Sequence, residues 1–428
     1  MNSRCSRCGT PVMEGQHVCP TCGAPLADFA GAQQQQFQQP QQVAPTMMFS
    51  QAAPTIVIRP SNKVSAIKVM LGVFAGLVAL LLGTVVLYLI GVETGPVALL
   101  AGLIFATLPV PIYITLILWL DRYEAEPLWL LALVFFWGAT VAVFIAFVLN
   151  TTGAYAVAIT AGREAAEFSG LAIFAPIIEE SAKGMVLFIV FFWKKDEFDG
   201  ILDGIVYAAM VGLGFAMTEN IQYYGRAALE GGLIAERNLF ILRGAIAPFS
   251  HPLFTSMTGI GLGWARQSNN KAIKILMPLI GLGLAMTLHF LWNFTAYVHG
   301  LLWILTYIFV MVPIFITALV VVFFAWRREG RIVREYLLPD FQRGMMSQDE
   351  YNRLCTVSGR MGLSFRALRG GGIGIWRARM RYNQMASELA FHRNRVSRGI
   401  HEGEQEARER EAAYLQMLQD LRNRLGQH

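Results

Sequence analysis

The chain has 428 residues, of which 55% are hydrophobic and only 15% charged, and its mean hydropathy is +0.46. This composition excludes an ordinary soluble globular protein and, because apolar runs of spanning length recur, indicates a polytopic membrane protein. The net charge of +6 does not indicate a nucleic-acid partner, since the basic residues concentrate in the tails and in short loops between apolar runs.

The first predicted element is a small zinc ribbon over residues 1–26. Cys5 and Cys8 form one C-x2-C pair, Cys19 and Cys22 form a second, and a glycine follows each pair. Two such turns can place four thiolates around one structural zinc ion, which a segment this short needs for stability. Two disulfides are the alternative, and the reducing side predicted below favours zinc over them.

A disordered linker is predicted over residues 27–65. The segment is rich in Gln, Ala and Pro, and such a composition cannot bury a core. No secretory signal peptide is expected ahead of it, because the first long apolar run begins only near Ala66.

An all-α membrane domain is predicted over residues 66–326, with about eight transmembrane helices. The eight apolar segments are 66–91, 97–120, 128–150, 170–193, 201–224, 245–265, 272–297 and 300–326.

Basic residues in the connecting loops predict the orientation. If the segments alternate, one side of the membrane receives most of the lysines and arginines, and this side is cytoplasmic by the positive-inside rule. The loop 225–243 is a mild exception, because it lies on the other side and contains Arg226, Arg237 and Arg243, offset by Glu230 and Glu236. We therefore expect a multi-pass protein of the plasma membrane with both termini in the cytoplasm.

The remaining residues, 327–428, are predicted to form a solvated cytoplasmic basic tail that is partly helical. Its arginine-rich stretches are expected to lie near anionic lipid headgroups. From Glu402 onward, charged residues and regularly spaced leucines predict a short amphipathic helix, which could bind a cytoplasmic protein partner. Cys355 is most simply a reduced thiol.

Four of the apolar segments carry polar residues that a hydrocarbon environment disfavours. Such residues usually face a polar cavity or a partner, and they often mark function. Counting 1.5 Å per residue along the alternating helices places the glutamates and the histidines among them in the outer half of the bilayer, which predicts one shared buried site. These candidate residues are Glu179, Glu180, Lys183, Glu219, Asn220, His251, His289 and Asn293.

Spacing predicts a shared face within each helix. Lys183 follows Glu179 by four residues and Glu180 by three, so its ammonium can neutralise one carboxylate. Each of the two histidines has a hydrogen-bonding residue four positions later, Thr255 in one case and Asn293 in the other.

Each group also has a purely structural interpretation. The carboxylates of Glu179 and Glu180 with Lys183 could be a structural intramembrane ion pair, and the Glu219–Asn220 pair could serve hydrogen bonding between helices. Either histidine could lie at the membrane interface.

Together these residues indicate hydrolysis. A carboxylate can take a proton from water, and two adjacent carboxylates can divide the roles of base and acid. The histidines and an asparagine could bind a divalent metal or stabilise the oxyanion of a tetrahedral intermediate. The sequence lacks His-Glu-x-x-His, so the usual helix motif of zinc proteases is absent.

The order of these motifs resembles the PrsW family of intramembrane proteases, which is distantly similar to the CAAX-prenyl endopeptidases. The resemblance covers roughly residues 66–326, and an N-terminal zinc ribbon is an accessory of some bacterial members. The motifs that carry it are Glu179-Glu180-x-x-Lys183, Phe215-x-x-x-Glu219-Asn220, His251, His289-x-x-Trp292-Asn293, the run from Asp121 to Pro127 and Phe136-Trp137-Gly138.

The resemblance implies cleavage of a membrane-anchored protein, such as an anti-sigma factor, near the extracytoplasmic side. If the roles known in the family apply to the matching residues, the Glu179–Glu180 pair would activate water. Glu219 and the two histidines would bind a metal or polarise the scissile carbonyl. Asn293 would support the oxyanion. The family resemblance leaves both a metal-dependent and a metal-free glutamic mechanism open.

Two other classes of function use the same residues. A transporter or channel could employ the buried carboxylates as a proton or cation path, although polar residues would then extend through the whole membrane thickness. A non-catalytic membrane scaffold could bind partners through the ribbon, which leaves the buried carboxylates unexplained.

Overall fold

The computed structural model describes residues 3–4, 11–12, 66–399 and 403–426, and the chain divides into two units, Met1–Arg59 and Pro60–His428. In the first unit, β1 (Ser3–Arg4) pairs antiparallel with β2 (Pro11–Val12). The four cysteines of the predicted ribbon and the whole predicted linker lie outside the described residues, so both stay predictions.

The described part of the second unit is helical, which confirms the predicted all-α class. Its α-helices are α1 (Ala66–Thr94), α2 (Pro96–Thr107), α3 (Val110–Leu120), α4 (Leu128–Phe136), α5 (Val143–Ala161), α6 (Arg163–Phe168), α7 (Ala175–Trp193), α8 (Ile201–Phe240), α9 (Ser250–Gln267), α10 (Lys271–Val298), α11 (Gly300–Thr306), α12 (Val312–Gln342), α13 (Gln348–Leu354), α14 (Val357–Ser397) and α15 (Glu404–Gly426). Four π-helical stretches join some of them: η1 (Trp137–Ala142), η2 (Ser169–Phe174), η3 (Ile241–Ile246) and η4 (Tyr307–Met311).

Six segments of the described chain are long and apolar enough to cross a membrane. These segments are Gly72–Thr94, Pro96–Leu120, Leu128–Ala161, Ile201–Gln267, Lys271–Val298 and Gly300–Gln342. The number differs from the predicted eight for two reasons. The helix α7 carries three charged residues and is not among the six, and Ile201–Gln267 contains two of the predicted segments.

The segment 225–243, predicted as an outer loop, is instead helical. The helix α8 continues to Phe240 across a kink at Gly232, and η3 follows directly. Gly232 has φ +65°, a conformation that glycine adopts without steric penalty. The chain therefore changes direction at this one residue and is helical on both sides of it. The residues on either side of the kink include several Ala, Leu and Glu, which favour a helix over an open loop.

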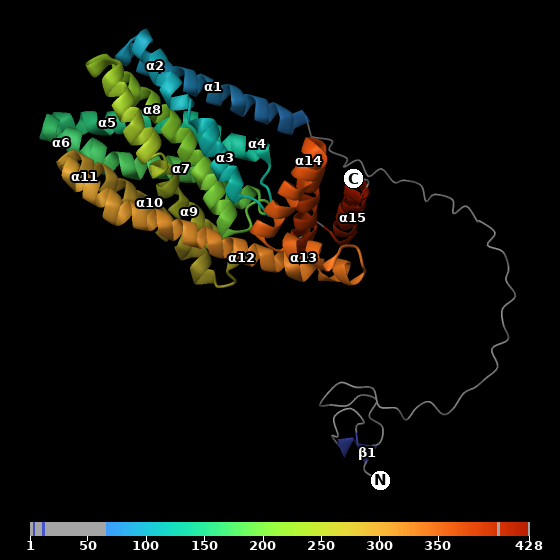
Figure 1. Ribbon diagram of the computed structural model, residues 1–428. Coiled ribbons are helices and arrows are strands. Elements are labelled where there is room, and N and C mark those ends of the chain that lie inside the picture. Colours follow the sequence, from blue (N-terminus) through green and yellow to red (C-terminus); the bar gives the residue numbers. More distant parts are fainter. Residues whose placement is uncertain (1–2, 5–10, 13–65, 400–402, 427–428) are drawn as a thin grey trace. The chain divides into compact units, whose positions relative to one another are not determined.

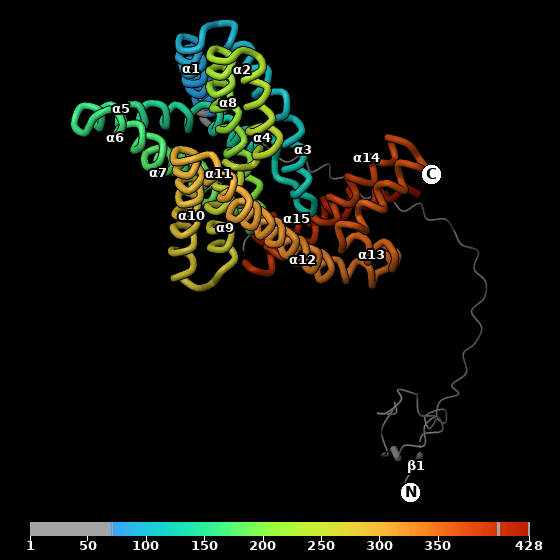
Figure 2. Tube along the Cα trace, turned by 60° about the vertical axis from the view of Figure 1, so that its left-hand side comes forward, coloured from blue at the N-terminus to red at the C-terminus, as the bar shows by residue number. Residues whose placement is uncertain are grey.

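The helix α8 lies at the centre of the bundle. In Figure 1 α1, α2 and α3 lie on one side of it, and α9 and α10 lie on the other; Figure 2 shows α8 between α1 and α3, with α9 and α10 below. It packs directly against α2, α4, α9 and η1. The core around it contains fully buried side chains such as Leu130, Val186, Val211 and Leu262. This central position brings residues of α8 within reach of several other helices.

Glycines let α8 and α9 approach closely. A Cβ atom on Gly204 would lie 2.1 Å from the carbonyl oxygen of Gly259, and one on Gly212 would lie 2.8 Å from the backbone nitrogen of Pro252. Small residues at such crossings allow two backbones to pack in contact within a membrane. The second contact holds the start of α9, and therefore His251, directly against α8.

The tail is a packed helical cluster rather than a mainly solvated segment. The end of α12 and helices α13, α14 and α15 share a core that includes Leu337, Tyr351, Leu389 and Phe391. The predicted amphipathic helix near the C-terminus is present as α15, which packs against α14. In Figures 1 and 2 these helices lie together at one end of the membrane bundle.

The tail cluster also contacts the connection between α3 and α4. The guanidinium of Arg360 lies 4.7 Å from the ring centroid of Tyr123, whose hydroxyl donates to the carbonyl of Cys355 at 3.2 Å. Arg395 forms an ion pair with Glu124. The segment 121–127 is therefore fixed from the tail side as well as by the bundle.

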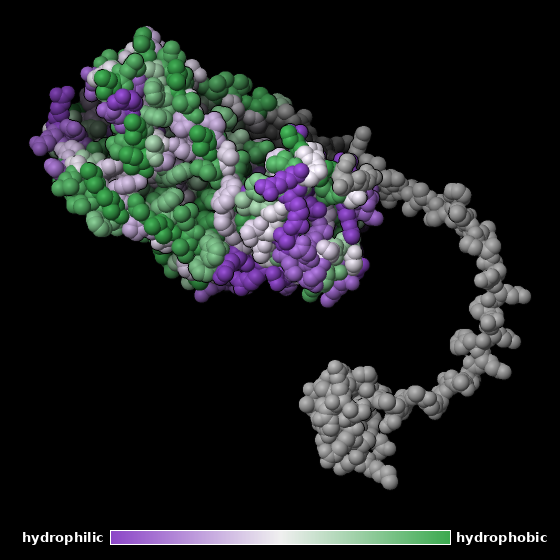
Figure 3. Space-filling model, viewed as in Figure 1, coloured by the Kyte–Doolittle hydropathy of each residue, from purple (hydrophilic) through white to green (hydrophobic). Residues whose placement is uncertain are grey.

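The outer surface of the bundle is suited to lipid. Large apolar side chains such as Leu77, Val97, Leu279 and Phe309 are more than half exposed. Figure 3 shows extensive hydrophobic surface over the bundle, which gives way to hydrophilic surface over the tail helices. Together with the six apolar segments, this surface identifies a membrane protein.

Candidate functional site

Four helices contribute side chains to one buried polar cluster. Within the described residues, α7 supplies Glu179, Glu180 and Lys183, α8 supplies Glu219, α9 supplies His251 and α10 supplies His289. The four sequence segments singled out for their polar residues therefore meet. Every one of these residues except Glu219 is at most 6% exposed.

Lys183 contacts three other residues of the cluster. Its Nζ lies 2.8 Å from Oε1 of Glu180, 3.4 Å from Oε2 of Glu179 and 3.0 Å from Nδ1 of His251. An ammonium group has three N–H donors and no acceptor, so this geometry uses all three donors. The ammonium also lies 3.8 Å from the ring centroid of Phe215, a favourable cation–π contact.

Glu180 is completely buried and uses both carboxylate oxygens. Its Oε1 contacts Lys183 and also lies 3.1 Å from Nδ1 of His289, and its Oε2 accepts a hydrogen bond from Thr255 at 2.9 Å. A buried carboxylate with this many partners is held in one position. Glu180 thereby joins α7, α9 and α10.

Glu179 has fewer partners. Its Oε2 lies 3.4 Å from Lys183 and 3.9 Å from Nε2 of His289, and its side chain is 8% exposed. No hydrogen bond to its other oxygen is present within the described residues. Of the two adjacent carboxylates, Glu179 is therefore the one with an oxygen available to a further group.

The hydrogen bonds fix how the two imidazoles are arranged. Because Lys183 can only donate, Nδ1 of His251 accepts, and Nε2 of His251 then donates to Glu219 at 2.9 Å. Nδ1 of His289 donates to Glu180, and the other ring nitrogen, Nε2, faces Glu179 at 3.9 Å. The two rings lie 5.1 Å apart between centroids.

Glu219 is paired with an arginine that the sequence interpretation did not assign to the site. Arg243 of η3 forms an ion pair with Glu219, and its Nε donates to Oδ1 of Asn220 at 2.6 Å. From the sequence, Arg243 is expected in an outer loop, as an exception to the positive-inside rule. An arginine that breaks the positive-inside rule in a segment facing a buried glutamate was the signal that could have identified it.

Two predicted neighbours have other partners. Thr255 donates to Glu180 rather than to its own-helix neighbour His251, and Asn293 donates through Nδ2 to the carbonyl of Leu171 at 3.0 Å. Leu171 lies in η2, and the shifted hydrogen bonding of a π-helical stretch leaves backbone carbonyls available to such donors. A spacing of four residues correctly predicts that each residue shares a helix face with its histidine. It does not indicate which neighbouring helix supplies the acceptor for Thr255 or Asn293.

Aromatic rings enclose the cluster. Phe215 lies beside His251 at 5.4 Å between centroids, and Phe254 stacks on His289 at 5.2 Å. Both rings are almost fully buried. Apolar walls of this kind lower the local dielectric constant and strengthen the electrostatic interactions within the cluster.

Three of the residues offer atoms that suit a divalent metal. Ligand atoms of Glu179, His251 and His289 all lie within 4.8 Å of one another. One carboxylate and two imidazoles form a typical ligand set for catalytic zinc, and each imidazole contacts a further carboxylate, Glu219 or Glu180, as metal-bound histidines do. The donor set therefore fits a metal, provided that the ammonium of Lys183 leaves Nδ1 of His251.

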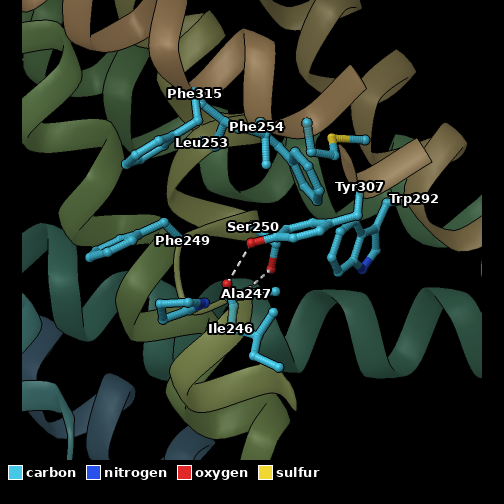
Figure 4. Close-up of a pocket in the computed structure, with 12 residues that line it drawn as sticks. Ile246, Ala247, Phe249, Ser250, Leu253, Phe254, Trp292, Tyr307 and Phe315 are labelled. Carbon is cyan, nitrogen blue, oxygen red and sulfur yellow. Dashed lines mark hydrogen bonds between the residues drawn. The ribbon is translucent and has the colours of Figure 1, made fainter. Parts of the chain in front are cut away.

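An apolar pocket of about 100 Å³ adjoins the cluster. Its wall includes Phe254 and Trp292, which are three residues beyond His251 and His289 respectively, and also Phe315 (Figure 4). The hydroxyl of Tyr307 donates to the carbonyl of Ile246 at 2.7 Å, so this polar group in the wall is already satisfied. The pocket is therefore suited to an apolar group.

Comparison with known proteins gives an independent result for the same segment. Residues 126–318 match the model of a family described as "PrsW family intramembrane metalloprotease". This match confirms the resemblance to the PrsW family. All eight predicted site residues lie within the matched range, whereas the tail helices and residues 121–125 lie outside it.

Curated relatives carry the same family name. The chain is 38% identical over 92 residues to "Protease PrsW" of Geobacillus kaustophilus (strain HTA426), an alignment that covers 22% of the chain and 37% of the relative. It is 32% identical over 123 residues to "Protease PrsW" of Oceanobacillus iheyensis, covering 28% of the chain and 50% of the relative, and 38% identical over 96 residues to "Protease PrsW" of Bacillus subtilis (strain 168), covering 22% and 39%.

The chain thus spans half or less of the length of these PrsW relatives. No solved structure shows a significant match to it.

Proposed function

We propose that the protein is an intramembrane endopeptidase that hydrolyses a peptide bond of a membrane-anchored protein. The observation that carries this proposal is the convergence of two carboxylates, a lysine and two imidazoles from separate apolar helices. The PrsW family match over residues 126–318 supports it. An anti-sigma factor with a single membrane span is the substrate class that the family resemblance suggests.

In this proposal Glu179 is the general base. It has the freer carboxylate of the pair, and Nε2 of His289 faces it across 3.9 Å. A water molecule held by these two groups would lose its proton to Glu179 as its oxygen attacks the scissile carbonyl carbon. Glu179 would then return the proton to the departing amine.

Glu180 and Lys183 act as positioning residues. Glu180 holds His289 through Nδ1 and holds Lys183 through Oε1. The ammonium of Lys183 lies between both carboxylates and His251, so it offsets the repulsion between two buried negative charges. It also supplies positive charge close to where the oxyanion of the tetrahedral intermediate forms.

In the metal-dependent form of the mechanism Glu179 would be a ligand instead of the base: Glu179, His251 and His289 would hold a divalent metal, and Glu180 and Glu219 would orient the imidazoles. When bound, it would supply Lewis-acid polarisation of the carbonyl and lower the pKa of a water molecule. The structural zinc of the N-terminal ribbon remains a separate proposal, supported by the spacing of Cys5, Cys8, Cys19 and Cys22.

We further propose that the apolar pocket beside Phe254 receives an apolar side chain of the substrate next to the scissile bond. The pocket adjoins His251 and His289 through Phe254, and a cavity of this size and lining suits an apolar group of a few carbon atoms. A substrate segment from within a membrane is rich in such side chains.

The test is cleavage of a co-expressed single-span substrate by isosteric variants. Glu179→Gln is expected to lower cleavage at least a hundredfold, because an amide cannot take the proton from water. The matched control is Glu167→Gln, an exposed carboxyl outside the cluster, which is expected to leave cleavage unchanged. Full cleavage by Glu179→Gln, in a protein that inserts normally, would contradict the proposal.

A second measurement separates the enzyme from a transporter. Purified protein in sealed liposomes is expected to give no proton or cation flux above that of empty liposomes. Flux that Glu179→Gln removes, without any proteolysis by the parent protein, would favour the transporter instead.

Metal content tests the metal-dependent form of the mechanism. The full chain with His251→Gln and His289→Gln is expected to carry one divalent ion fewer than the parent chain, while both share any zinc of the ribbon. Equal metal content in a correctly folded variant would favour the metal-free glutamic mechanism.

A further inference from the structure

Another pocket, much larger than the one beside Phe254, lies at the end of the bundle that bears the tail helices. It has a volume of about 800 Å³ and is lined by the start of α8, the end of α9, α12 and the connection between α13 and α14. None of the residues proposed for proteolysis lines it, so its purpose is not explained by that site.

One part of the pocket wall is strongly basic. It contains four arginines within two turns of α12: Arg327, Arg328, Arg331 and Arg334. Arg327 and Arg331 are exposed, and neither forms an ion pair with any described residue. They lie four positions apart, so they share one face of the helix.

The single carboxylate of the wall does not neutralise these arginines. Glu329 lines the pocket, but its Oε2 is shielded from solvent and has no hydrogen-bond partner within the described residues. The pocket therefore keeps an excess of three positive charges when its four arginines and one glutamate are counted.

The other part of the wall is apolar and belongs to the membrane-spanning bundle. Val321, Phe324 and Ala325 precede the arginines on α12, and Ile201 and Leu202 lie opposite them at the start of α8. Phe324 is 60% exposed. The pocket thus changes from apolar to basic along α12. Figure 3 shows the same kind of change on the surface, from the hydrophobic bundle to the hydrophilic tail helices.

We propose that this pocket binds an anionic phospholipid, with the phosphate group against the arginines and the first part of the acyl chains against the apolar wall. A guanidinium offers paired N–H donors that match phosphate oxygens. A free phosphate ion would use the basic wall alone, whereas a lipid uses both walls. The occupant is therefore an amphiphile of the membrane rather than a soluble anion.

The test is lipid retention by the full-length protein in neutral detergent. Native mass spectrometry would count the phosphatidylglycerol molecules kept by each chain during titration, with phosphatidylcholine of the same acyl length as the zwitterionic comparison. Each arginine near an anionic lipid contributes about a fivefold effect on affinity. The double variant Arg327→Gln/Arg331→Gln is therefore expected to bind phosphatidylglycerol about twenty- to thirtyfold more weakly.

The matched control is Arg366→Gln/Arg369→Gln, which removes two exposed arginines from α14 outside the pocket. This control is expected to keep the affinity of the parent protein. Equal weakening by both double variants would mean that only the overall charge matters and would overturn the proposal. Equal retention of phosphatidylcholine, or binding of inorganic phosphate as tight as that of the lipid, would overturn it too.

Discussion

Buried carboxylates gather at two levels of the membrane domain, and the two groups are held in different ways. In the site cluster, Glu179 and Glu180 share the ammonium of Lys183 and both face His289. About eighteen ångströms away along α8, counting 1.5 Å per residue from Glu219 to Tyr207, a second group gathers around the connection between α3 and α4.

The second group relies on neutral donors and on one arginine from the tail. Asp121 accepts from the backbone N–H of Glu126 at 2.5 Å, and Glu126 accepts from the hydroxyl of Tyr207. Only Glu124 has a cationic partner within 4 Å among the described residues, Arg395.

The protonation of this group follows from its environment. Burial raises the pKa of Asp121 to about 8, although the hydrogen bond from Glu126 opposes the shift. Burial also raises the pKa of Glu126 well above its usual range, and the nearby carboxylates of Asp203 and Asp121 add to the effect. With a pKa of about 8, Asp121 keeps its proton at neutral pH and serves as a structural hydrogen-bonding group.

The comparison shows that burial alone does not identify a reactive carboxylate. The ammonium of Lys183 and two imidazoles with exchangeable protons surround the carboxylates of the site cluster. Those of the second group contact a tyrosine, backbone N–H groups and, for Glu124 alone, an arginine. We expect only the first group to be needed for chemistry.

The largest expected effect contrasts one glutamate of each group. Glu180→Gln is expected to lower cleavage at least a hundredfold, since it removes the negative charge that holds Lys183 and His289. Glu126→Gln is expected to stay within about threefold of the parent, because an amide oxygen still accepts the hydrogen bond from Tyr207. Initial rates of cleavage of one substrate measure both, and comparable losses would remove the distinction between the groups.

An intermediate effect is expected on stability at the second group. Arg395→Gln leaves Glu124 without its cation, and the side chains of this pair are only 11% and 24% exposed. A charge-assisted hydrogen bond of this kind contributes about 2 kcal/mol to the free energy of unfolding. Thermal unfolding in detergent should show the loss for Arg395→Gln but not for Arg381→Gln, which removes an exposed arginine of the same helix.

The smallest effect, taken per pH unit, is a change in the pH dependence of the free energy of unfolding. The carboxyl of Asp121 keeps its proton up to about pH 8 in the folded protein but loses it near pH 4 when unfolded. The folded form therefore binds one more proton between these values, and its stability falls as pH rises through this range. Asp121→Asn should reduce this fall by up to about 1.4 kcal/mol per pH unit.

Chemical denaturation at several pH values between 4 and 8 measures this slope. Asp349→Asn changes a carboxyl that is 62% exposed and serves as the control, for which no change in slope is expected. An unchanged slope for Asp121→Asn would show that Asp121 is already ionised at pH 7.

Much of the site could be predicted from sequence because ionisable residues are rare in apolar helices. The carboxylate pair, Lys183 and the two histidines each stood out against apolar neighbours, and the positive-inside rule placed them at a similar depth. Their order along the chain then indicated the resemblance to the PrsW family.

Other features depend on contacts between helices that no local pattern encodes. Arg243 was missed because a segment with charged residues near a pair of glycines resembles a loop. In the structure this segment stays helical on both sides of the kink at Gly232, and Arg243 lies against Glu219. The tail core was missed because the arginines of α14 suggested solvation, although Arg360 is buried against Tyr123.

The most direct test of the central claim is a double-mutant cycle between Glu180 and His289, which are 109 residues apart in sequence and 3.1 Å apart in the structure. The free energy of unfolding in detergent would be measured for the parent, Glu180→Gln, His289→Gln and the double variant. Residues in direct contact are expected to show a coupling free energy of about 1–3 kcal/mol. Losses that add within about 0.3 kcal/mol would mean that α7 and α10 do not meet at these side chains and would contradict the account.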